Sequence, residues 1–144
     1  MTELVNDGLV RAIGMSNYEF TDVERCHRQR SVDVVQTGLS MIDYVEDRAW
    51  ISQCEELGIG VVIYEPLASG ILTGKTVEQV RATWTGVWLE SDFYQRLLTP
   101  GQAERSFAVA DGIRPIAEKF GATVAQVAIA WVLDALIPLG PNFG

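Results

Sequence analysis

Polar side chains follow three apolar runs of this sequence, at the points where each run would leave a sheet. These side chains are Ser16, Asn17, Gln36 and Tyr64. The carboxyl ends of parallel strands meet at one edge of a sheet, so we expect the four to line one rim. Amides can both donate to and accept from a carboxamide, and a tyrosine ring can stack on a flat heterocycle. Together they predict a binding site for a nicotinamide, although each residue alone is more typical of a strand end or turn.

A loop of small residues comes directly after the third apolar run. Pro66, Ser69, Gly70, Gly74 and Lys75 lie in it. Such a loop lets backbone N–H groups approach an anion closely, and here a cation stands at its end. The loop is a phosphate-binding candidate; the alternative is a turn without a ligand.

Three strands and two helices must position these groups. Runs rich in β-branched residues predict strands over 9–15, 32–35 and 59–64, the third of them buried on both faces. A capping box at Thr21 and Glu24 predicts a helix over 22–29. Asp47 is a candidate N-cap for a second helix, and Gly58 is its predicted stop. The order β, α, β, α, β predicts right-handed crossovers in a parallel sheet.

The second half of the chain is predicted to be mainly helical. A less regular stretch, residues 76–102, contains Trp84, Trp88, Phe93 and Tyr94. It is interpreted as a long loop with one or two helical turns that its aromatic residues anchor, and alternatively as an aromatic lid over a ligand. Apolar periodicity predicts helices over 103–120 and from Thr123 onward, and residues 135–144 are predicted to fray.

Composition narrows the class of protein. The chain has 144 residues and a net charge of −8, which argues against broad binding of nucleic acid. It has no apolar run of the roughly 18 residues that a membrane span needs, and its N-terminus lacks the pattern of a secretory signal. We therefore expect one cytoplasmic domain over residues 1–144. Cys26 and Cys54 are predicted to be free thiols rather than metal ligands, and His27 a surface residue.

Four segments resemble the aldo-keto reductase family, in the family's order. They are residues 11–17 (RAIGMSN), 34–36 (VVQ), 64–75 (YEPLASGILTGK) and 125–133 (AQVAIAWVL). The resemblance implies a (β/α)8 barrel oxidoreductase that transfers hydride between NAD(P)H and a carbonyl, with NADP(H) expected over NAD(H). It also implies that Ser16, Asn17 and Gln36 hold the carboxamide and that Tyr64 stacks on the ring. The pyrophosphate is expected against the loop residues Pro66, Leu67, Ala68, Gly70, Leu72 and Lys75.

The chain also departs from the family pattern. The catalytic Asp, Tyr, Lys and His of the family lie before the segment that corresponds to residue 10, so we expect no catalytic residue here. A closed barrel needs about 250 residues, so this chain is expected to be a partial barrel, about strands five to seven with their helices. The carbonyl substrate then belongs to the parent enzyme, and the isolated chain is predicted to be inactive.

Two other interpretations remain open. The chain could be a non-catalytic nucleotide-binding or regulatory module of the same fold. It could also be an inactive truncated product, because an open three-stranded sheet has two unpaired edges and an uncovered face. Those edges also predict possible self-association.

Overall fold

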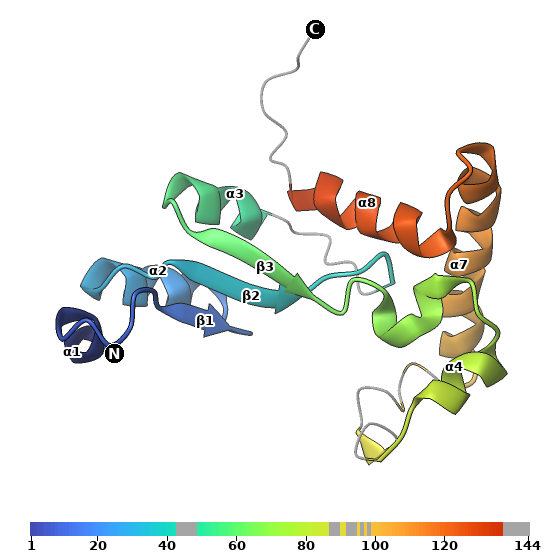
Figure 1. Cartoon of the computed structure of the whole chain (residues 1–144), viewed down its shortest axis with the longest axis horizontal. Coiled ribbons are helices and arrows are strands. Elements are labelled where there is room, and N and C mark those ends of the chain that lie inside the picture. Colours follow the sequence, from blue (N-terminus) through green and yellow to red (C-terminus); the bar gives the residue numbers. More distant parts are fainter. Residues whose placement is uncertain (43–48, 87–89, 92–94, 96, 98, 137–144) are drawn as a thin grey trace, which may run out of the picture. The chain divides into compact units, whose positions relative to one another are not determined.

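The computed structural model describes residues 1–42, 49–86, 90–91, 95, 97 and 99–136 (Figure 1). The chain divides into two compact units, a sheet unit and a helical unit. The sheet unit comprises Met1–Leu39, Val45–Tyr64 and Leu136–Gly144, and the helical unit comprises Ser40–Tyr44 and Glu65–Ala135. The prediction of a single domain over residues 1–144 stays a prediction.

The sheet unit alternates strands and helices as the sequence predicts. Its elements are α1 (Thr2–Asn6), β1 (Gly14–Ser16), α2 (Phe20–Gln29), β2 (Val34–Gly38), α3 (Ala49–Glu56) and β3 (Gly60–Tyr64). The strands form a parallel sheet in the order β1-β2-β3, so β2 has a partner on each side. Ser16 pairs with Gln36, and Gly38 pairs with Tyr64. The parallel pairing brings the three carboxyl ends to the same edge.

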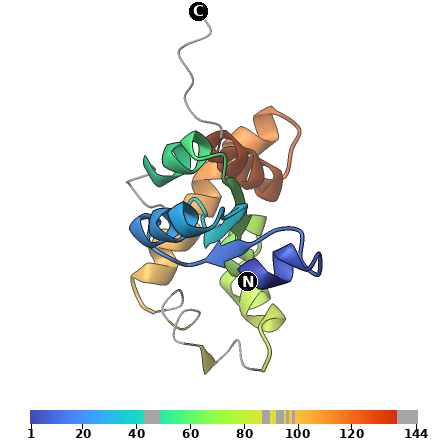
Figure 2. The ribbon, with the colours of Figure 1, turned by 90° about the vertical axis from the view of Figure 1, so that its left-hand side faces the viewer.

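Within the described part of the sheet unit, helices cover one face of the sheet. Val35 lies in a core with Val23 of α2 and Cys54 of α3, and both helices lie on the same side of the strands (Figure 2). On the opposite face, Val62 is 46% exposed and Tyr64 is 38% exposed. The prediction that the third strand is buried on both faces is therefore wrong. An apolar run in the sequence does not reveal whether other elements cover both faces of the strand.

The first strand is shorter than predicted. The run from Leu9 to Ile13 is not strand, because the backbone N–H groups of Leu9 and Val10 both donate to the carbonyl of Leu4, at 2.9 and 3.1 Å, and so close α1. The capping box predicted at Thr21 is also wrong. Helix α2 already begins at Phe20, and its N-cap residue, Glu19, makes no side-chain capping bond.

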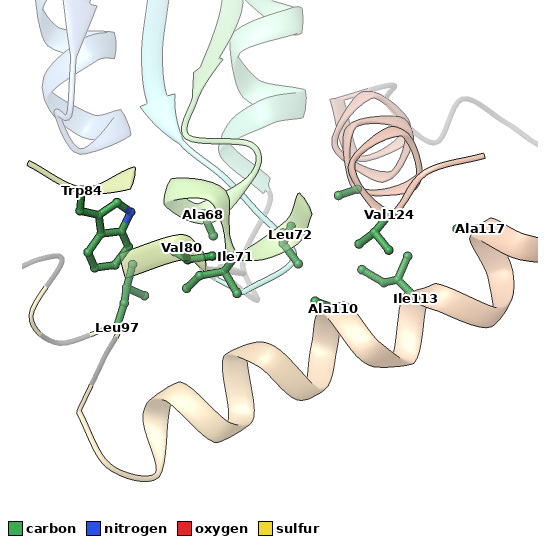
Figure 3. Close-up of a cluster of buried hydrophobic side chains, with 11 residues drawn as sticks. Ala68, Ile71, Leu72, Val80, Trp84, Leu97, Ala110, Ile113, Ala117 and Val124 are labelled. Atoms are coloured by element: carbon green, nitrogen blue, oxygen red, sulfur yellow. The ribbon is translucent and has the colours of Figure 1, made fainter. Parts of the chain in front are cut away.

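In its described residues the helical unit contains a 3-10 helix and three α-helices. These are η1 (Ala68–Thr73), α4 (Val77–Thr83), α7 (Gln102–Lys119) and α8 (Val124–Leu136). Ile71 and Leu72 of η1 are fully buried, and they share one core with Val80 of α4, Ile113 of α7 and Val124 of α8 (Figure 3). The loop that follows β3 is therefore an integral part of this core.

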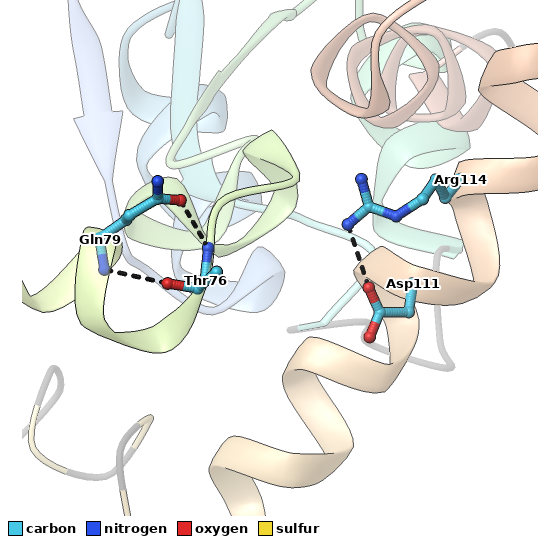
Figure 4. A network of polar contacts seen from close by, with 4 residues as sticks. All are labelled: Thr76, Gln79, Asp111 and Arg114. Atoms are coloured by element: carbon cyan, nitrogen blue, oxygen red, sulfur yellow. Dashed lines mark hydrogen bonds and ion pairs between the residues drawn. The ribbon is translucent and has the colours of Figure 1, made fainter.

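Two capping boxes begin helices of this unit. The backbone N–H of Gln79 donates to the Thr76 hydroxyl at 3.3 Å, and the Thr76 N–H donates to the Gln79 side chain at 3.0 Å (Figure 4). Thr123 and Gln126 form the same pair at the start of α8, as predicted for Thr123. Helix α4 lies inside the stretch 76–102, which was interpreted as a long loop with one or two helical turns. Its Val80 side chain is fully buried in the core of the helical unit.

Helix α8 extends to Leu136, so the first two residues of the tail that was predicted to fray are helical. Residues 137–144 lie outside the described residues, as do Asp47, Trp88, Phe93 and Tyr94. Within the described part of the chain no single helix is long and apolar enough to cross a bilayer. Helices α7 and α8 meet that test of length and composition only as a pair, bent by 97°.

Ile71 should contribute much more to stability than an exposed isoleucine. Ile71→Ala removes a fully buried side chain from the core of the helical unit, so we expect the free energy of unfolding to fall by about 2–5 kcal/mol. Ile116→Ala is the matched control, because Ile116 is 48% exposed and its truncation should cost less than about 0.5 kcal/mol. Urea titration followed by circular dichroism measures both, and equal losses would contradict this description of the core.

Candidate functional site

The carboxyl edge of the sheet holds a hydrogen bond that joins its two outer strands. The Tyr64 hydroxyl, at the end of β3, donates to Asn17 Oδ1, just beyond β1, at 2.8 Å. Asn17 has a φ of 60°, a left-handed conformation that asparagine tolerates better than most residues. Its backbone N–H donates to the carbonyl of Gln36 at 3.1 Å, which fixes this turn against β2.

The tyrosine ring reaches Asn17 because the strand between them ends in a glycine. A Cβ placed on Gly38 would lie only 3.1, 3.2 and 3.3 Å from Cε2, Cζ and the hydroxyl oxygen of Tyr64. The ring therefore lies over the Gly38 backbone. A side chain at this position would require the ring to shift by a few tenths of an ångström.

The other two predicted residues lie on the same open face. Ser16 and Gln36 are neighbours in the register of β1 and β2, and both are exposed. Gly14 and Gly60 occupy the row before them and flank Val34. The structure thus gathers the four predicted residues near one edge of the sheet unit, with an exposed aromatic ring among amide and hydroxyl groups. The prediction that the second strand ends before Gln36 is wrong, because β2 continues through Gln36 to Gly38.

The loop after β3 has an unusual backbone. Ala68, Ser69 and Gly70 are consecutive residues with φ angles of 46°, 56° and 95°. Only glycine adopts this region without penalty, and each of the other residues stores about 1–3 kcal/mol of strain. The backbone N–H groups of Ala68, Gly70 and Leu72 are bonded within the loop. The first donates to the carbonyl of Glu65 at 3.0 Å, and the other two donate to the carbonyl of Leu67, both at 3.1 Å.

Both polar backbone groups of Ser69 are hydrogen-bonded to side chains. The carboxylate Oε2 of Glu65 accepts from the Ser69 N–H at 2.6 Å and from its hydroxyl at 3.0 Å. The indole N–H of Trp84 donates to the Ser69 carbonyl at 2.9 Å. We call Glu65, Ser69 and Trp84 the Ser69 clamp. It accounts for the persistence of a strained backbone at a residue that has a Cβ.

The remaining loop residues divide into buried and accessible ones. Ala68 and Leu72 are fully buried, while Pro66, Leu67 and Gly70 are partly buried. Lys75 follows Gly74, which has a φ of 77°, and is exposed. Lys75 is the cation of this segment.

Sequence reasoning missed two residues that shape these regions, Gly38 and Glu65. Gly38 had a signal, because a glycine inside a strand often marks a close approach of another group. Glu65 had none, and Trp84 was predicted only as an anchoring aromatic residue, since the bonds of both to Ser69 depend on the left-handed turn there. Trp84 is 8% exposed, which for this residue favours the anchoring interpretation of the aromatic stretch over the lid.

The two cysteines are not part of either region. Both are free thiols, Cys26 exposed and Cys54 buried. Burial raises the pKa of the Cys54 thiol, which makes a reactive thiolate at neutral pH unfavourable.

Comparison with known proteins gives a consistent result. The sequence profile of the family described as "Aldo/keto reductase family" matches residues 1–141. The chain is 31% identical over 134 residues to a Glycine max protein described as "Probable aldo-keto reductase 1". It is 26% identical over 139 residues to the NADH-specific methylglyoxal reductase of Escherichia coli.

A solved structure supports the same relationship. The glycerol dehydrogenase of Gluconobacter oxydans superimposes with a TM-score of 0.77 at 26% identity, over 92% of this chain and 39% of that one. The matches to the soybean and bacterial reductases cover 93% and 92% of this chain but 37% and 39% of those proteins. The chain therefore spans well under half the length of each of these relatives.

Loss of the Tyr64 hydroxyl should cost little stability. Tyr64→Phe keeps the ring over Gly38 but removes the bond to Asn17. Because the bond is exposed, we expect the free energy of unfolding to fall by about 0.5–1 kcal/mol. Tyr18→Phe, at a tyrosine that is 60% exposed, is the control and should change nothing measurable. Urea titration of both variants provides the test, and a larger loss in Tyr18→Phe would contradict the assignment.

Proposed function

Because the chain belongs to the aldo-keto reductase family, we propose that it supplies the nicotinamide and pyrophosphate side of a dinucleotide site in a carbonyl or alcohol oxidoreductase. The observation that carries this proposal is the Tyr64 ring, which lies over Gly38 and is bonded to Asn17. An exposed ring held by its own hydroxyl can stack on a planar heterocycle without first having to be ordered.

Ser16, Asn17 and Gln36 are the proposed partners of the carboxamide. With its oxygen accepting from Tyr64, the Asn17 side chain has its NH₂ group as its remaining donor. Gln36 offers both a donor and an acceptor from the neighbouring strand. These groups can fix which way the nicotinamide lies, and orientation is the main contribution a protein makes to hydride transfer.

The pyrophosphate is proposed to bind to the loop after β3. Pro66, Leu67, Ala68, Gly70 and Leu72 contribute the backbone of this site, and Lys75 contributes a positive charge. The exposed side chain of Lys75 at the end of the loop supports this assignment, because an ammonium group attracts a phosphate.

The chain's own residues bind and orient, and the remaining chemistry comes from elsewhere. The reduced nicotinamide supplies the hydride that reduces the carbonyl carbon. Protonation of the carbonyl oxygen needs a donor within hydrogen-bond reach, and we propose that a part of the enzyme outside this chain provides it. In this proposal β1, β2 and β3 correspond to strands five to seven of a (β/α)8 barrel, and the carbonyl substrate belongs to the parent enzyme.

The choice between NADP(H) and NAD(H) stays a prediction. NADP(H) was expected over NAD(H), but the comparisons lend no support, because the E. coli relative is described as NADH-specific. The expected location in the cytoplasm also remains a prediction from the sequence.

Two alternatives to this proposed function are physically reasonable. A non-catalytic nucleotide-binding module would bind the dinucleotide through the same residues. An inactive truncated product is supported by the open sheet face, where Val62 is 46% exposed. Self-association through the outer edges of β1 and β3 follows from the second alternative, and light scattering over a range of concentrations tests it: a constant monomer mass excludes it.

Titration of the purified chain with NADPH, and separately with NADH, tests the proposed site through the fluorescence of its four tryptophans. We expect saturable quenching that weakens in Gly38→Ala, because the new Cβ would require the Tyr64 ring to shift by a few tenths of an ångström. Gly60→Ala is the matched control on the same face, since its Cβ would meet the Asp33 carbonyl at an ordinary 3.5 Å. Gln36→Ala and Tyr64→Ala should weaken binding as well.

Absence of quenching in a folded chain would contradict the proposed site. Equal weakening by Gly38→Ala and Gly60→Ala would show that the position of the Tyr64 ring is irrelevant to binding.

The isolated chain should not reduce carbonyls. We expect no steady consumption of NADPH in the presence of a generic aldehyde, because the proposed proton donor lies outside the chain. The absorbance of the dihydronicotinamide band measures this consumption. Turnover that disappears in Tyr64→Ala would overturn this prediction and show that the chain contains a proton donor of its own.

A further inference from the structure

The Ser69 clamp holds a conformation that the local sequence does not favour. Ser69 sits between Ala68 and Gly70 in a run of left-handed residues, and Glu65 itself has a φ of 56°. Several non-glycine residues in this region persist only where their surroundings over-determine them. The clamp supplies such surroundings, since it bonds the N–H, the hydroxyl and the carbonyl of Ser69.

The two arms of the clamp come from different parts of the sequence. Glu65 lies four residues before Ser69, and Trp84 lies fifteen residues after it. Trp84 is itself immobilised, because it is 8% exposed and belongs to the same buried cluster as Leu97 (Figure 3). The loop is therefore tied to the core of the helical unit through the Ser69 carbonyl.

We propose that Glu65 and Trp84 are positioning residues that hold the loop in this left-handed conformation before the dinucleotide arrives. The proposal rests on the proposed function of this loop as the pyrophosphate site. A loop that adopts its binding conformation only part of the time binds more weakly by that fraction, so loosening the clamp should reduce affinity.

The carboxylate of Glu65 could have the opposite effect. It is an anion that already bonds the Ser69 N–H and hydroxyl, so it could compete with a phosphate for them. The two roles predict opposite signs, because removal of a competitor strengthens binding and removal of a positioning residue weakens it. We infer the positioning role because a second, uncharged group, the Trp84 indole, holds the same residue from its other side.

Calorimetric titration of the purified chain with NADPH, and with inorganic pyrophosphate as a competitor, tests the proposal. Glu65→Ala should weaken both ligands about tenfold. Glu65→Gln should stay within about threefold of the unsubstituted chain, because its amide oxygen can still accept from both Ser69 donors. Glu118→Ala, at an exposed glutamate of α7, removes the same charge and should leave affinity unchanged.

If circular dichroism shows that Glu65→Ala is unfolded, a second variant still tests the proposal. Trp84→Phe keeps an aromatic ring in the core but removes the N–H that bonds Ser69, and it too should weaken both ligands. Amide hydrogen exchange of the unliganded variants should show faster exchange at Ser69 in Glu65→Ala than in Glu65→Gln.

The possible failures are distinguishable. No binding by the folded, unsubstituted chain overturns the proposed function and the positioning role with it. If the unsubstituted chain binds, the positioning role alone is overturned when affinity is unchanged or higher in Glu65→Ala and unchanged in Trp84→Phe. If Glu65→Gln and Glu65→Ala weaken ligand binding equally, the effect comes from loss of the carboxylate charge and not from loss of the bonds to Ser69. This result would also overturn the positioning role.

Discussion

The candidate site depends on the absence of a side chain at Gly38. Because β2 ends in a residue without a Cβ, the ring of Tyr64 can cross it and donate to Asn17 at 2.8 Å. One exposed hydrogen bond contributes little to stability, yet it ties the ends of the outer strands together and fixes an aromatic ring on an open sheet face. The polar residues beside it gain a defined arrangement from this contact.

The loop after β3 is stabilised in a different way. Its backbone is strained, and the strain is offset by burial of Ala68, Ile71 and Leu72 and by the bonds to Ser69. A strained turn that is held on both sides is rigid before any ligand binds, which reduces the entropy that binding must overcome. In the proposed function, the sheet edge contacts a flat ring and the loop contacts an anion.

Sequence reasoning succeeded where the signal was local and periodic. The ends of β1 and β3 at Ser16 and Tyr64, the parallel sheet, and the helix begun by Thr123 all follow from apolar runs and capping residues. It failed where a nearby competitor decided the outcome: the carbonyl of Leu4 takes the N–H groups of the residues predicted to begin the first strand. The bonds to Ser69 were unpredictable, since their acceptor and donor meet only around a left-handed turn.

The most direct test of this account is a two-dimensional ¹H–¹⁵N spectrum of the labelled chain, recorded with increasing NADPH. The account predicts saturable shifts of two groups of amides with one dissociation constant: those at the strand ends around Asn17 and Tyr64, and those of the loop from Ala68 to Leu72. Shifts confined to surface residues outside both groups, or a folded chain whose spectrum does not change, would contradict it.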